Sequence, residues 1–306
     1  MENTFDMLII GSGPAGLGAA LYAARAGINA AIVEKNPVSG GQIINTTEVD
    51  NYLGLPGIGG YEMGETFRAH VEKMGAVFIE DTISSVKSSD GLYVAEGVSG
   101  TYTSKTIVFA MGAERSRLGI PGESEYVGRG VSYCATCDGA FFRKKDTVVI
   151  GGGDVAVEDA IYLAGLCEHV TLVHRRDELR ASVSLQNALL SRENVTVEWN
   201  SVAEEVIGEG KVTALKIRNK ETGETKEIPA SGVFIAVGMD PVSELAKGVC
   251  DLNERGYIIA GEDCATSAPG VYAAGDIRTK HLRQVITAVA DGACAVSSAE
   301  VYIRTL

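Results

Sequence analysis

Two stretches of the chain share one order of apolar and polar positions. Residues 8–24 read LIIGSGPAGLGAALYAA and residues 148–164 read VVIGGGDVAVEDAIYLA, and the two align without a gap. In each, an unbroken apolar run that is typical of a buried strand leads into a glycine-rich turn and then into helical spacing. A second apolar strand follows each helix, at residues 30–33 and 170–173. The pattern predicts two βαβ openings, each of the kind that binds a dinucleotide.

The glycines in these turns have distinct physical tasks. The first, Gly11 or Gly151, permits the sharp turn out of the strand, and the second lets the backbone approach a pyrophosphate. The third position, Gly16 or Ala156, lets the helix pack close to the strand. The phosphates then meet the helix N-terminus, where unpaired N–H groups and the helix dipole favour anions. A repeated motif in this context is much more specific than one glycine turn alone.

A third strand-loop-helix segment occupies residues 269–296, with a short strand that ends at Gly275-Asp276 and a small-residue helix that starts near Arg283. We expect it to return to the first domain, because the second glycine turn lies between them. The predicted fold class is α/β, with two Rossmann-like three-layer domains, the second inserted into the first. The predicted domains are residues 1–113 with 246–306, for FAD, and residues 114–245, for NADPH. Glycines lie close to the two places where the chain passes between these domains, near 113–118 and 240–246.

Composition narrows the function classes. The chain has 306 residues, 45% of them hydrophobic, with a net charge of −13 and a pI near 4.9. The acidic balance argues against non-specific binding to nucleic acid and to anionic membranes. The N-terminus lacks the pattern of a signal peptide, and we find no apolar run of the roughly 18 residues that span a bilayer. We therefore expect a cytoplasmic protein with no nucleic-acid or membrane partner.

The residues after each second strand distinguish the two dinucleotides. Glu34 ends the first of these strands, and a carboxylate there can accept a hydrogen bond from a ribose hydroxyl, as FAD and NAD sites require. The matching stretch of the second unit, residues 174–180, reads HRRDELR. Its arginines favour the 2′-phosphate of NADPH, although a solvated charged loop has the same composition. The acid after the first unit and the arginines after the second therefore predict FAD at the first site and NADPH at the second.

The spacing of the cysteines singles out one pair among six. Four stand alone, and we expect them to be small buried hydrophobes: Cys167, Cys250, Cys264 and Cys294. Cys134 and Cys137 form a Cys-Ala-Thr-Cys motif. Zinc would need about four ligands, and a structural disulfide is unusual in the cytosol. Two inert thiols would not need a flanking acid, so a redox dithiol fits best.

Asp138 follows this pair directly. Thiol–disulfide exchange makes and consumes thiolates, so a neighbouring carboxylic acid can shuttle the proton. The alternative is that Asp138 caps a helix. We predict Cys134, Cys137 and Asp138 as the catalytic group.

The whole chain resembles the low-molecular-weight thioredoxin reductases of bacteria and archaea. The matching motifs are GSGPAG at 11–16, GGQ at 40–42, EVDNY at 48–52, CATCDG at 134–139, GGGDVAVE at 151–158, HRRD at 174–177, and GD at 275–276 with RQ at 283–284. His281 stands where many relatives have proline and Met111 where threonine is common; neither touches the predicted chemistry. The resemblance implies a homodimer, with Cys137 nearer the flavin and Asp138 as the acid.

The resemblance also implies which residues bind the cofactors, and we predict no metal. The FAD set is Gly11, Ser12, Gly13, Pro14, Ala15, Gly16, Glu34, Lys35, Gly40, Gly41, Gln42, Asn51, Gly112, Gly275, Asp276, Arg283, Gln284 and Val285. The NADPH set is Gly151, Gly152, Gly153, Asp154, Val155, Ala156, Glu158, His174, Arg175, Arg176 and Arg180.

Together these features predict a thioredoxin-disulfide reductase, in which electrons pass from NADPH through FAD and the cysteine pair to thioredoxin or a thioredoxin-like protein. Because the pair and the NADPH site share the inserted domain, we hypothesise that this domain rotates to present them to the flavin in turn. Three alternatives stay open. They are a ferredoxin–NADP reductase of similar fold, the same chemistry with a glutaredoxin-like or peroxidase partner, and a flavin-containing redox sensor.

Overall fold

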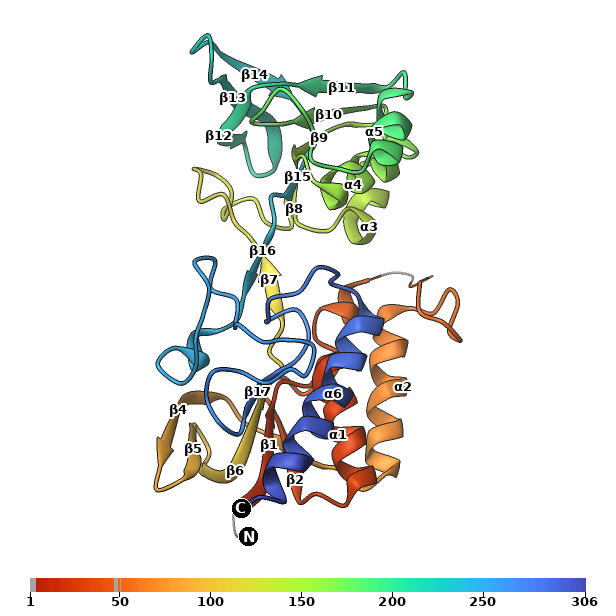
Figure 1. Ribbon diagram of the computed structural model, residues 1–306. Helices are drawn as coiled ribbons and strands as arrows, with labels where there is room; N and C mark the ends of the chain where they lie inside the picture. The colour runs from red at the N-terminus through yellow and green to blue at the C-terminus, as the bar shows by residue number, and fades with distance from the viewer. Residues whose placement is uncertain (1–3, 47–48, 50) are drawn as a thin grey trace. The chain divides into compact units, whose positions relative to one another are not determined.

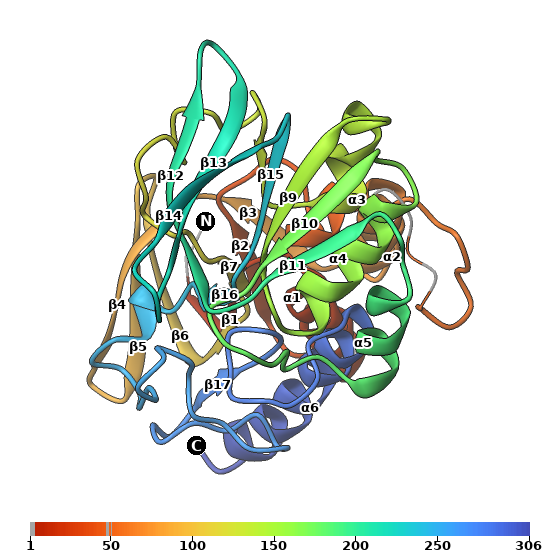
Figure 2. The same ribbon diagram turned by 90° about the horizontal axis from the view of Figure 1, so that it is seen from above.

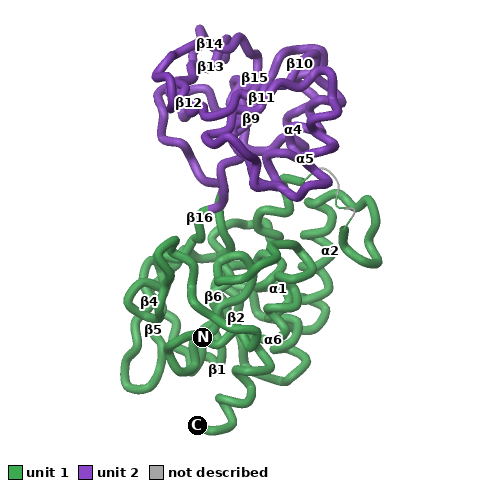
Figure 3. The backbone as a smooth tube through the Cα atoms, turned by 45° about the horizontal axis from the view of Figure 1, so that its top comes forward, with its two compact units in different colours: residues 1–114, 240–306 green, residues 115–239 purple. Residues whose placement is uncertain are grey.

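The structure, a computed structural model, describes residues 4–46, 49 and 51–306. These residues form two compact units, which Figure 3 shows in separate colours. Unit 1 comprises residues 1–114 and 240–306, and unit 2 comprises residues 115–239. The predicted fold class, one Rossmann-like unit inserted into another, is confirmed.

Unit 1 is a helix-covered sheet. Its strands are β1 (Thr4–Ile10), β2 (Ala30–Glu34), β3 (Val77–Glu80), β4 (Ile83–Ser89), β5 (Leu92–Gly97), β6 (Thr101–Phe109) and β17 (Val271–Ala273). They run in the order β3-β2-β1-β6-β5-β4, with β17 beside β6. The helices are α1 (Pro14–Ala26), α2 (Gly60–Lys73) and α6 (Val285–Ile303), with the short 3₁₀ turns η1 (Gly41–Asn45) and η3 (Glu244–Ala246). In Figure 1, α1, α2 and α6 lie together on one side of this sheet.

The sheet of unit 1 is buried on both faces, which explains its unbroken apolar strands. Along β1, Met7 and Ile9 join the core beneath the helices, whereas Leu8 and Ile10 join the core on the opposite face. The pairing of β1 with β2 and with β6 is parallel, so the predicted first βαβ opening is confirmed. The pairing of β17 with β6 is also parallel, which confirms that the C-terminal segment returns to the first unit.

Glycines let α1 and α6 approach closely. A Cβ added at Gly18 would lie 2.7 Å from the carbonyl oxygen of Val289, and one added at Gly292 would overlap the backbone of α1. We expected no apolar run of membrane-spanning length, yet among the described residues α6 is long and apolar enough to cross a membrane by length and composition. It also carries Asp291, which is buried and ion-paired. Its packing on α1 is that of a core helix.

Unit 2 has a parallel sheet with different layers on its two faces. The sheet runs in the order β11 (Val195–Glu198), β10 (His169–Val173), β9 (Asp146–Gly151), β15 (Gly232–Ala236), β8 (Val131–Ser132). The helical layer contains α3 (Ala135–Asp138), the 3₁₀ turn η2 (Gly139–Phe142), α4 (Asp154–Ala164) and α5 (Val183–Leu190). The other layer is an antiparallel sheet of β12 (Ser201–Gly208), β13 (Val212–Asn219) and β14 (Thr225–Pro229). Figure 2 shows the helices on one side of the parallel sheet and β12–β14 on the other.

The parallel sheet of unit 2 is buried on both faces, like the sheet of unit 1. Along β9, Val149 faces the helices, whereas Val148 and Ile150 face the antiparallel layer. β9 pairs with β10 in parallel, and α4 follows β9 directly, so the second predicted βαβ opening is confirmed.

The chain enters and leaves unit 2 through paired strands. These are β7 (Ala113–Arg115) and β16 (Met239–Pro241). The second unit boundary, at residues 239/240, lies before the 245/246 boundary that the sequence suggested. The reason is that η3 already belongs to unit 1, where Ala246 is fully buried in the core.

Candidate active site

The predicted redox pair lies where β8 leads into α3, within unit 2. Cys134 and Cys137 are joined as a disulfide. Cys134 caps α3, because its Sγ accepts the backbone N–H of Cys137 at 3.2 Å. β8 is an edge strand that pairs in parallel with β15, which fixes the start of the motif. Such a pair can cycle between disulfide and dithiol.

Asp138 is bound to a residue that the sequence pattern did not single out. The hydroxyl of Ser132, which is 4% exposed, lies 2.6 Å from Oδ2 of Asp138. The same hydroxyl accepts the backbone N–H of Cys134 at 3.0 Å. The capping alternative for Asp138 does not hold, because Cys134 caps α3 and Asp138 makes no side-chain cap at η2. The only sequence signal for Ser132 was its place two residues before the motif.

A buried carboxylate secures the residue before the pair. Glu123, which is 1% exposed, accepts hydrogen bonds from the backbone N–H groups of Leu118 and Gly119 and from the hydroxyl of Tyr133 at 2.7 Å. Burial, with a further contribution from Glu123, raises the pKa of Tyr133 to about 12. Glu123 therefore joins the first stretch of unit 2 to the start of the cysteine motif. Neither Glu123 nor Tyr133 was predicted from the sequence.

The first glycine turn has the tight geometry that the motif predicts. Gly11 has a φ of 102°, and an added Cβ would lie 2.7 Å from the carbonyl oxygen of Ala110. A Cβ at Gly16 would overlap the carbonyl oxygen of Gly11, so the third glycine is needed for helix packing. Gly13 is the N-cap of α1, with Pro14 as the first helical residue. The free N–H groups of the first helical turn can receive an anion here.

Glu34 is held beside this turn. Its Oε2 accepts the backbone N–H of Ser12 at 2.8 Å and the hydroxyl of Ser12 at 2.9 Å, and its Oε1 accepts the backbone N–H of Asn36 at 3.0 Å. The exposed side-chain amide of Asn36 donates to the same Oε1 at 3.1 Å, and a ribose hydroxyl would take the place of this amide at the carboxylate. The geometry fits the predicted contact with a ribose of FAD.

The C-terminal segment adds two buried polar atoms with unmet hydrogen-bonding needs. Within the described residues, Oδ1 of Asp276 and Nε of Arg283 are buried without a hydrogen-bond partner. Burial raises the pKa of the Asp276 carboxyl. Unpaired buried groups of this kind are costly, so they fit a ligand with both hydroxyls and phosphates, as FAD has. The guanidinium of Arg283 also lies 4.3 Å from the ring centroid of Tyr257.

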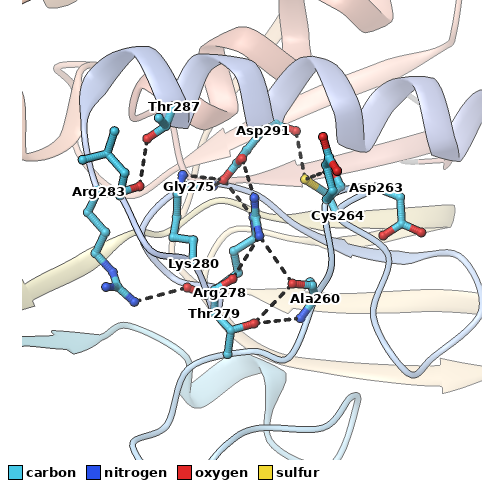
Figure 4. A network of polar contacts seen from close by, with 12 residues as sticks. Ala260, Asp263, Cys264, Gly275, Arg278, Thr279, Lys280, Arg283, Thr287 and Asp291 are labelled. Atoms are coloured by element: carbon cyan, nitrogen blue, oxygen red, sulfur yellow. Dashed lines mark hydrogen bonds and ion pairs between the residues drawn. The ribbon is translucent and has the colours of Figure 1, made fainter.

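A salt-bridge network holds this segment in place (Figure 4). Asp291 accepts hydrogen bonds from Nη2 of Arg278 at 2.7 Å and from Nζ of Lys280 at 2.8 Å, and its Oδ2 also accepts the backbone N–H of Gly275 at 2.9 Å. Arg278 is 9% exposed and Asp291 6%. Asp291, on α6, therefore fixes the turn after β17 that carries Gly275 and Asp276.

The structure places the whole predicted FAD set in unit 1. Asn51 donates from Nδ2 to Oε1 of Gln284 at 2.9 Å, which ties the loop before α2 to the N-cap of α6. The helix that we expected near Arg283 begins at Val285, with Gln284 in a capping box. The remaining members lie after β2, at η1 and after β6: Lys35, Gly40, Gly41, Gln42 and Gly112.

The side chain of a histidine packs against the second glycine turn and supports it. The ring of His174 lies between two backbone carbonyls, with Nδ1 2.8 Å from the oxygen of Gly151 and Nε2 2.9 Å from that of Glu178. A Cβ at Gly152 would overlap this ring, whereas a Cβ at Gly153 would meet nothing within 4 Å. Desolvation lowers the pKa of His174, which favours the neutral imidazole. His174 thus supports the turn, while open space lies before Gly153.

The arginine loop lies next to this turn. Arg175, Arg176 and Arg180 are exposed, and within the part of the chain that the structure describes none takes part in an ion pair. The backbone N–H of Arg180 donates to the carbonyl of Gly152 at 2.7 Å, which ties the loop to the turn. Asp154, at the start of α4, accepts the backbone N–H of Ser182 at 2.7 Å. Three available guanidinium groups beside an open helix N-terminus fit a dinucleotide with an extra phosphate.

Unit 2 therefore brings together the predicted NADPH set and the cysteine pair. The remaining members of that set, Val155, Ala156 and Glu158, lie on α4. The expectation for the other cysteines was wrong in part. Cys167 and Cys264 are buried, but Cys250 is only partly buried and Cys294 is exposed.

Two Rossmann-like units, one of which carries a disulfide beside a carboxyl group, define a nucleotide-dependent disulfide oxidoreductase. The chain matches the model of the pyridine nucleotide-disulphide oxidoreductase family over residues 5–292, and it belongs to that family. It is 46% identical to a thioredoxin reductase of Peptoclostridium litorale, over 100% of this chain and 99% of that protein. It is 43% identical to one of Listeria innocua, over 100% and 96%.

Solved structures agree with these relatives. The crystal structure of Lactococcus lactis thioredoxin reductase in its FR conformation matches with a TM-score of 0.89 at 40% identity, over 99% of this chain and 100% of that one. The T. acidophilum thioredoxin reductase matches with a TM-score of 0.85 at 37% identity, over 99% of both chains. The chain is a flavoprotein oxidoreductase with FAD and NADPH as its cofactors.

Proposed function

We propose that the chain is a thioredoxin-disulfide reductase that carries electrons from NADPH, through FAD and the Cys134–Cys137 pair, to thioredoxin or a thioredoxin-like protein. The observation that carries this proposal is the disulfide beside the Ser132-bound carboxyl of Asp138, in the unit that also holds the arginine-ended glycine turn. Relatives of the same length that are named thioredoxin reductase support it.

FAD binds in unit 1 and NADPH in unit 2 in this proposal. Gly11–Gly16 and Glu34 hold the adenosine and pyrophosphate of FAD, while Asp276 and Arg283 supply the buried groups that need partners. Gly151–Ala156 receives the pyrophosphate of NADPH, and the exposed arginines receive its 2′-phosphate. When bound, NADPH supplies a hydride and FAD accepts it and passes two electrons to the disulfide.

The residues of the chain then perform thiol–disulfide exchange. Two electrons break the S–S bond, and Cys134 and Cys137 become a thiol and a thiolate. One thiolate attacks the disulfide of the partner and forms a mixed disulfide, and the other cysteine displaces the partner and restores the original bond. The partner leaves as a dithiol with two more protons than it brought. Asp138 holds and transfers one of these protons.

We propose that unit 2 turns relative to unit 1 during each cycle. The cysteine pair and the proposed NADPH site share unit 2, and both need the same flavin, so they must use it in turn. The strands β7 and β16 form the connection, and they are flanked by Gly112 and Gly238, whose φ angles are 70° and 140°. A cross-link that ties the units in one orientation should block turnover; full activity under that constraint would refute the motion.

We also propose that the protein is a homodimer in the cytoplasm and uses neither nucleic acid nor a membrane as a partner. The net charge of −13 supports the last point. Light scattering on the purified protein measures the mass in solution, and a monomer at working concentration would contradict the dimer.

The test of the proposed function is one assay with a matched variant. The purified yellow protein is mixed with NADPH, thioredoxin and a disulfide dye, and NADPH oxidation and dye reduction are followed. Cys137→Ser should abolish dye reduction but leave NADPH oxidation by ferricyanide. Cys294→Ser, which replaces the exposed cysteine of unit 1, should retain both activities. A colourless protein, or one indifferent to thioredoxin, would overturn the proposal.

A further inference from the structure

The hydroxyl of Ser132 is the meeting point of the cysteine motif and its acid. It lies 2.6 Å from Oδ2 of Asp138, 3.0 Å from the backbone nitrogen of Cys134 and 3.2 Å from the carbonyl oxygen of Cys134. Ser132 is buried, and its strand β8 is paired with β15 through Val131 and Ser132 itself. The hydroxyl therefore keeps its position while the cysteines change their bonding.

A hydroxyl has one hydrogen and two lone pairs, so the hydroxyl of Ser132 can arrange its hydrogen bonds with these groups in two ways. When Asp138 is ionised, Ser132 accepts the N–H of Cys134 and donates its own hydrogen to Oδ2. When Asp138 is protonated on Oδ2, the acid donates to Ser132, and the serine hydrogen turns to the carbonyl of Cys134. Rotation about one C–O bond connects the two states, and each of these polar groups keeps a partner in both.

We propose that Ser132 is the positioning residue that lets Asp138 gain and lose a proton without rearrangement of the cysteine motif. Ser132 does not touch the reacting sulfurs in this role; it acts through Asp138. The proposal deepens the proposed function and rests on it, because it names how the acid of the same site is controlled.

The proton balance of the exchange identifies the step at which Ser132 acts. A thiolate attacks one sulfur of the Cys134–Cys137 disulfide and forms a mixed disulfide with it, while the bond between the two cysteines breaks and the displaced cysteine leaves as a thiolate. Protonated Asp138 gives its proton to that thiolate and becomes a carboxylate, which then recovers a proton from water. The carboxylate form is stabilised at once by the hydrogen that Ser132 donates, and charge-assisted bonds of this kind are the stronger ones.

The experiment follows reduction of the Cys134–Cys137 disulfide by dithiothreitol in the FAD-containing protein, with the new thiols trapped and counted by mass. Ser132→Ala should slow this reduction about 10- to 100-fold, the effect of losing one hydrogen bond to a charged group. Ser132→Thr keeps the hydroxyl and should recover most of the rate, whereas Ser132→Val has the shape of threonine without the hydroxyl and should not. If Ser132→Ala does not fold, the comparison of Ser132→Thr with Ser132→Val still tests the role of the hydroxyl.

A double-mutant cycle separates this role from a purely structural one. Asp138→Asn should itself be slow, and Ser132→Ala in that background should cost almost nothing further, because the serine acts through the acid. Ser201→Ala is the matched control, since Ser201 is an equally buried serine of unit 2 that donates to the carbonyl of Trp199. It should react at the wild-type rate.

Two results would overturn the inference: a Ser132→Val protein as fast as Ser132→Thr, or single-mutant losses that multiply in full in the double mutant. Failure of the proposed function has a different outcome. In that case the wild-type protein would not pass electrons from NADPH to thioredoxin, while the effect of Ser132 on dithiothreitol exchange would persist.

Discussion

The glycine turn of unit 2 offers a sharp test, because two adjacent glycines should respond differently to the same substitution. In Gly152→Ala the new methyl group would overlap the imidazole of His174, which is 4% exposed and cannot move aside into solvent. In Gly153→Ala the methyl group would point into open space, and the backbone at Gly153, with φ −96° and ψ −178°, is one that alanine readily adopts.

The cost of Gly152→Ala follows from the contacts of His174. Displacing the ring removes the hydrogen bond that the neutral imidazole donates, worth about 1 kcal/mol, and leaves a partly buried carbonyl of Gly151 or Glu178 unpaired, worth about 1 kcal/mol more. We therefore expect a loss of about 2 kcal/mol in the free energy of unfolding, or roughly 5–10 °C in the melting temperature of unit 2. Gly153→Ala should change the free energy of unfolding by less than about 0.5 kcal/mol.

The assay is thermal unfolding of both variants, combined with the KM for NADPH. On the proposed cofactor placement, Gly153→Ala fills the space that the pyrophosphate needs, so its KM for NADPH should rise while its melting temperature holds. Gly152→Ala should lose both stability and NADPH affinity. If the two variants melt at the same temperature, His174 is not fixed beneath the turn, and its ring moves aside for the methyl group at little cost.

Two further substitutions test other buried charges. Asp291→Asn leaves buried Arg278 without its carboxylate and should lower the free energy of unfolding in urea by about 3–5 kcal/mol. Glu300→Gln, the control, breaks an exposed pair with Arg304 and should lower it by less than about 1 kcal/mol. Similar losses in the two variants would contradict this prediction. Burial raises the pKa of Asp159 from 3.8 to about 6, so the folded state loses stability as the pH rises through that window. Asp159→Asn should therefore increase the free energy of unfolding at pH 7.5 by up to about 3 kcal/mol but leave it unchanged at pH 3.5, and an equal increase at both would refute it.

The sequence predicted features whose physical cause is local. Gly11 is required by its positive φ of 102°, and Gly16 is required because a Cβ there would overlap the carbonyl oxygen of Gly11 in the same turn. The unbroken apolar run at 148–150 follows from burial on both faces of β9. The contrast between Glu34 and the arginines after β10 is likewise visible in the sequence. Such features need no knowledge of distant partners, so the fold class and the division into two Rossmann-like units could be predicted.

The remaining features depend on partners that no local pattern reveals. Asp291 lies on a helix of small apolar residues, and only the fold brings Arg278 and Lys280 to it. Glu123 resembles any surface glutamate in the sequence, yet it is buried against the backbone N–H of Gly119. Ser132 is one serine among many until β8 and α3 place it against Asp138. The exposure of Cys294 also depended on which face of α6 meets the sheet.

The pairing of β17 with β6 and of α6 with α1 has a consequence for synthesis of the protein. Unit 2 is one continuous stretch of chain, so it can fold as soon as residue 239 has left the ribosome. Unit 1 cannot be completed then, because β17 and α6 are still to be made, and the face of α1 that Gly292 covers stays open. Unit 2 should thus fold first, while the N-terminal part of unit 1 keeps an apolar face exposed. Ribosome-bound chains that end before β17 should be the ones that chaperones bind most.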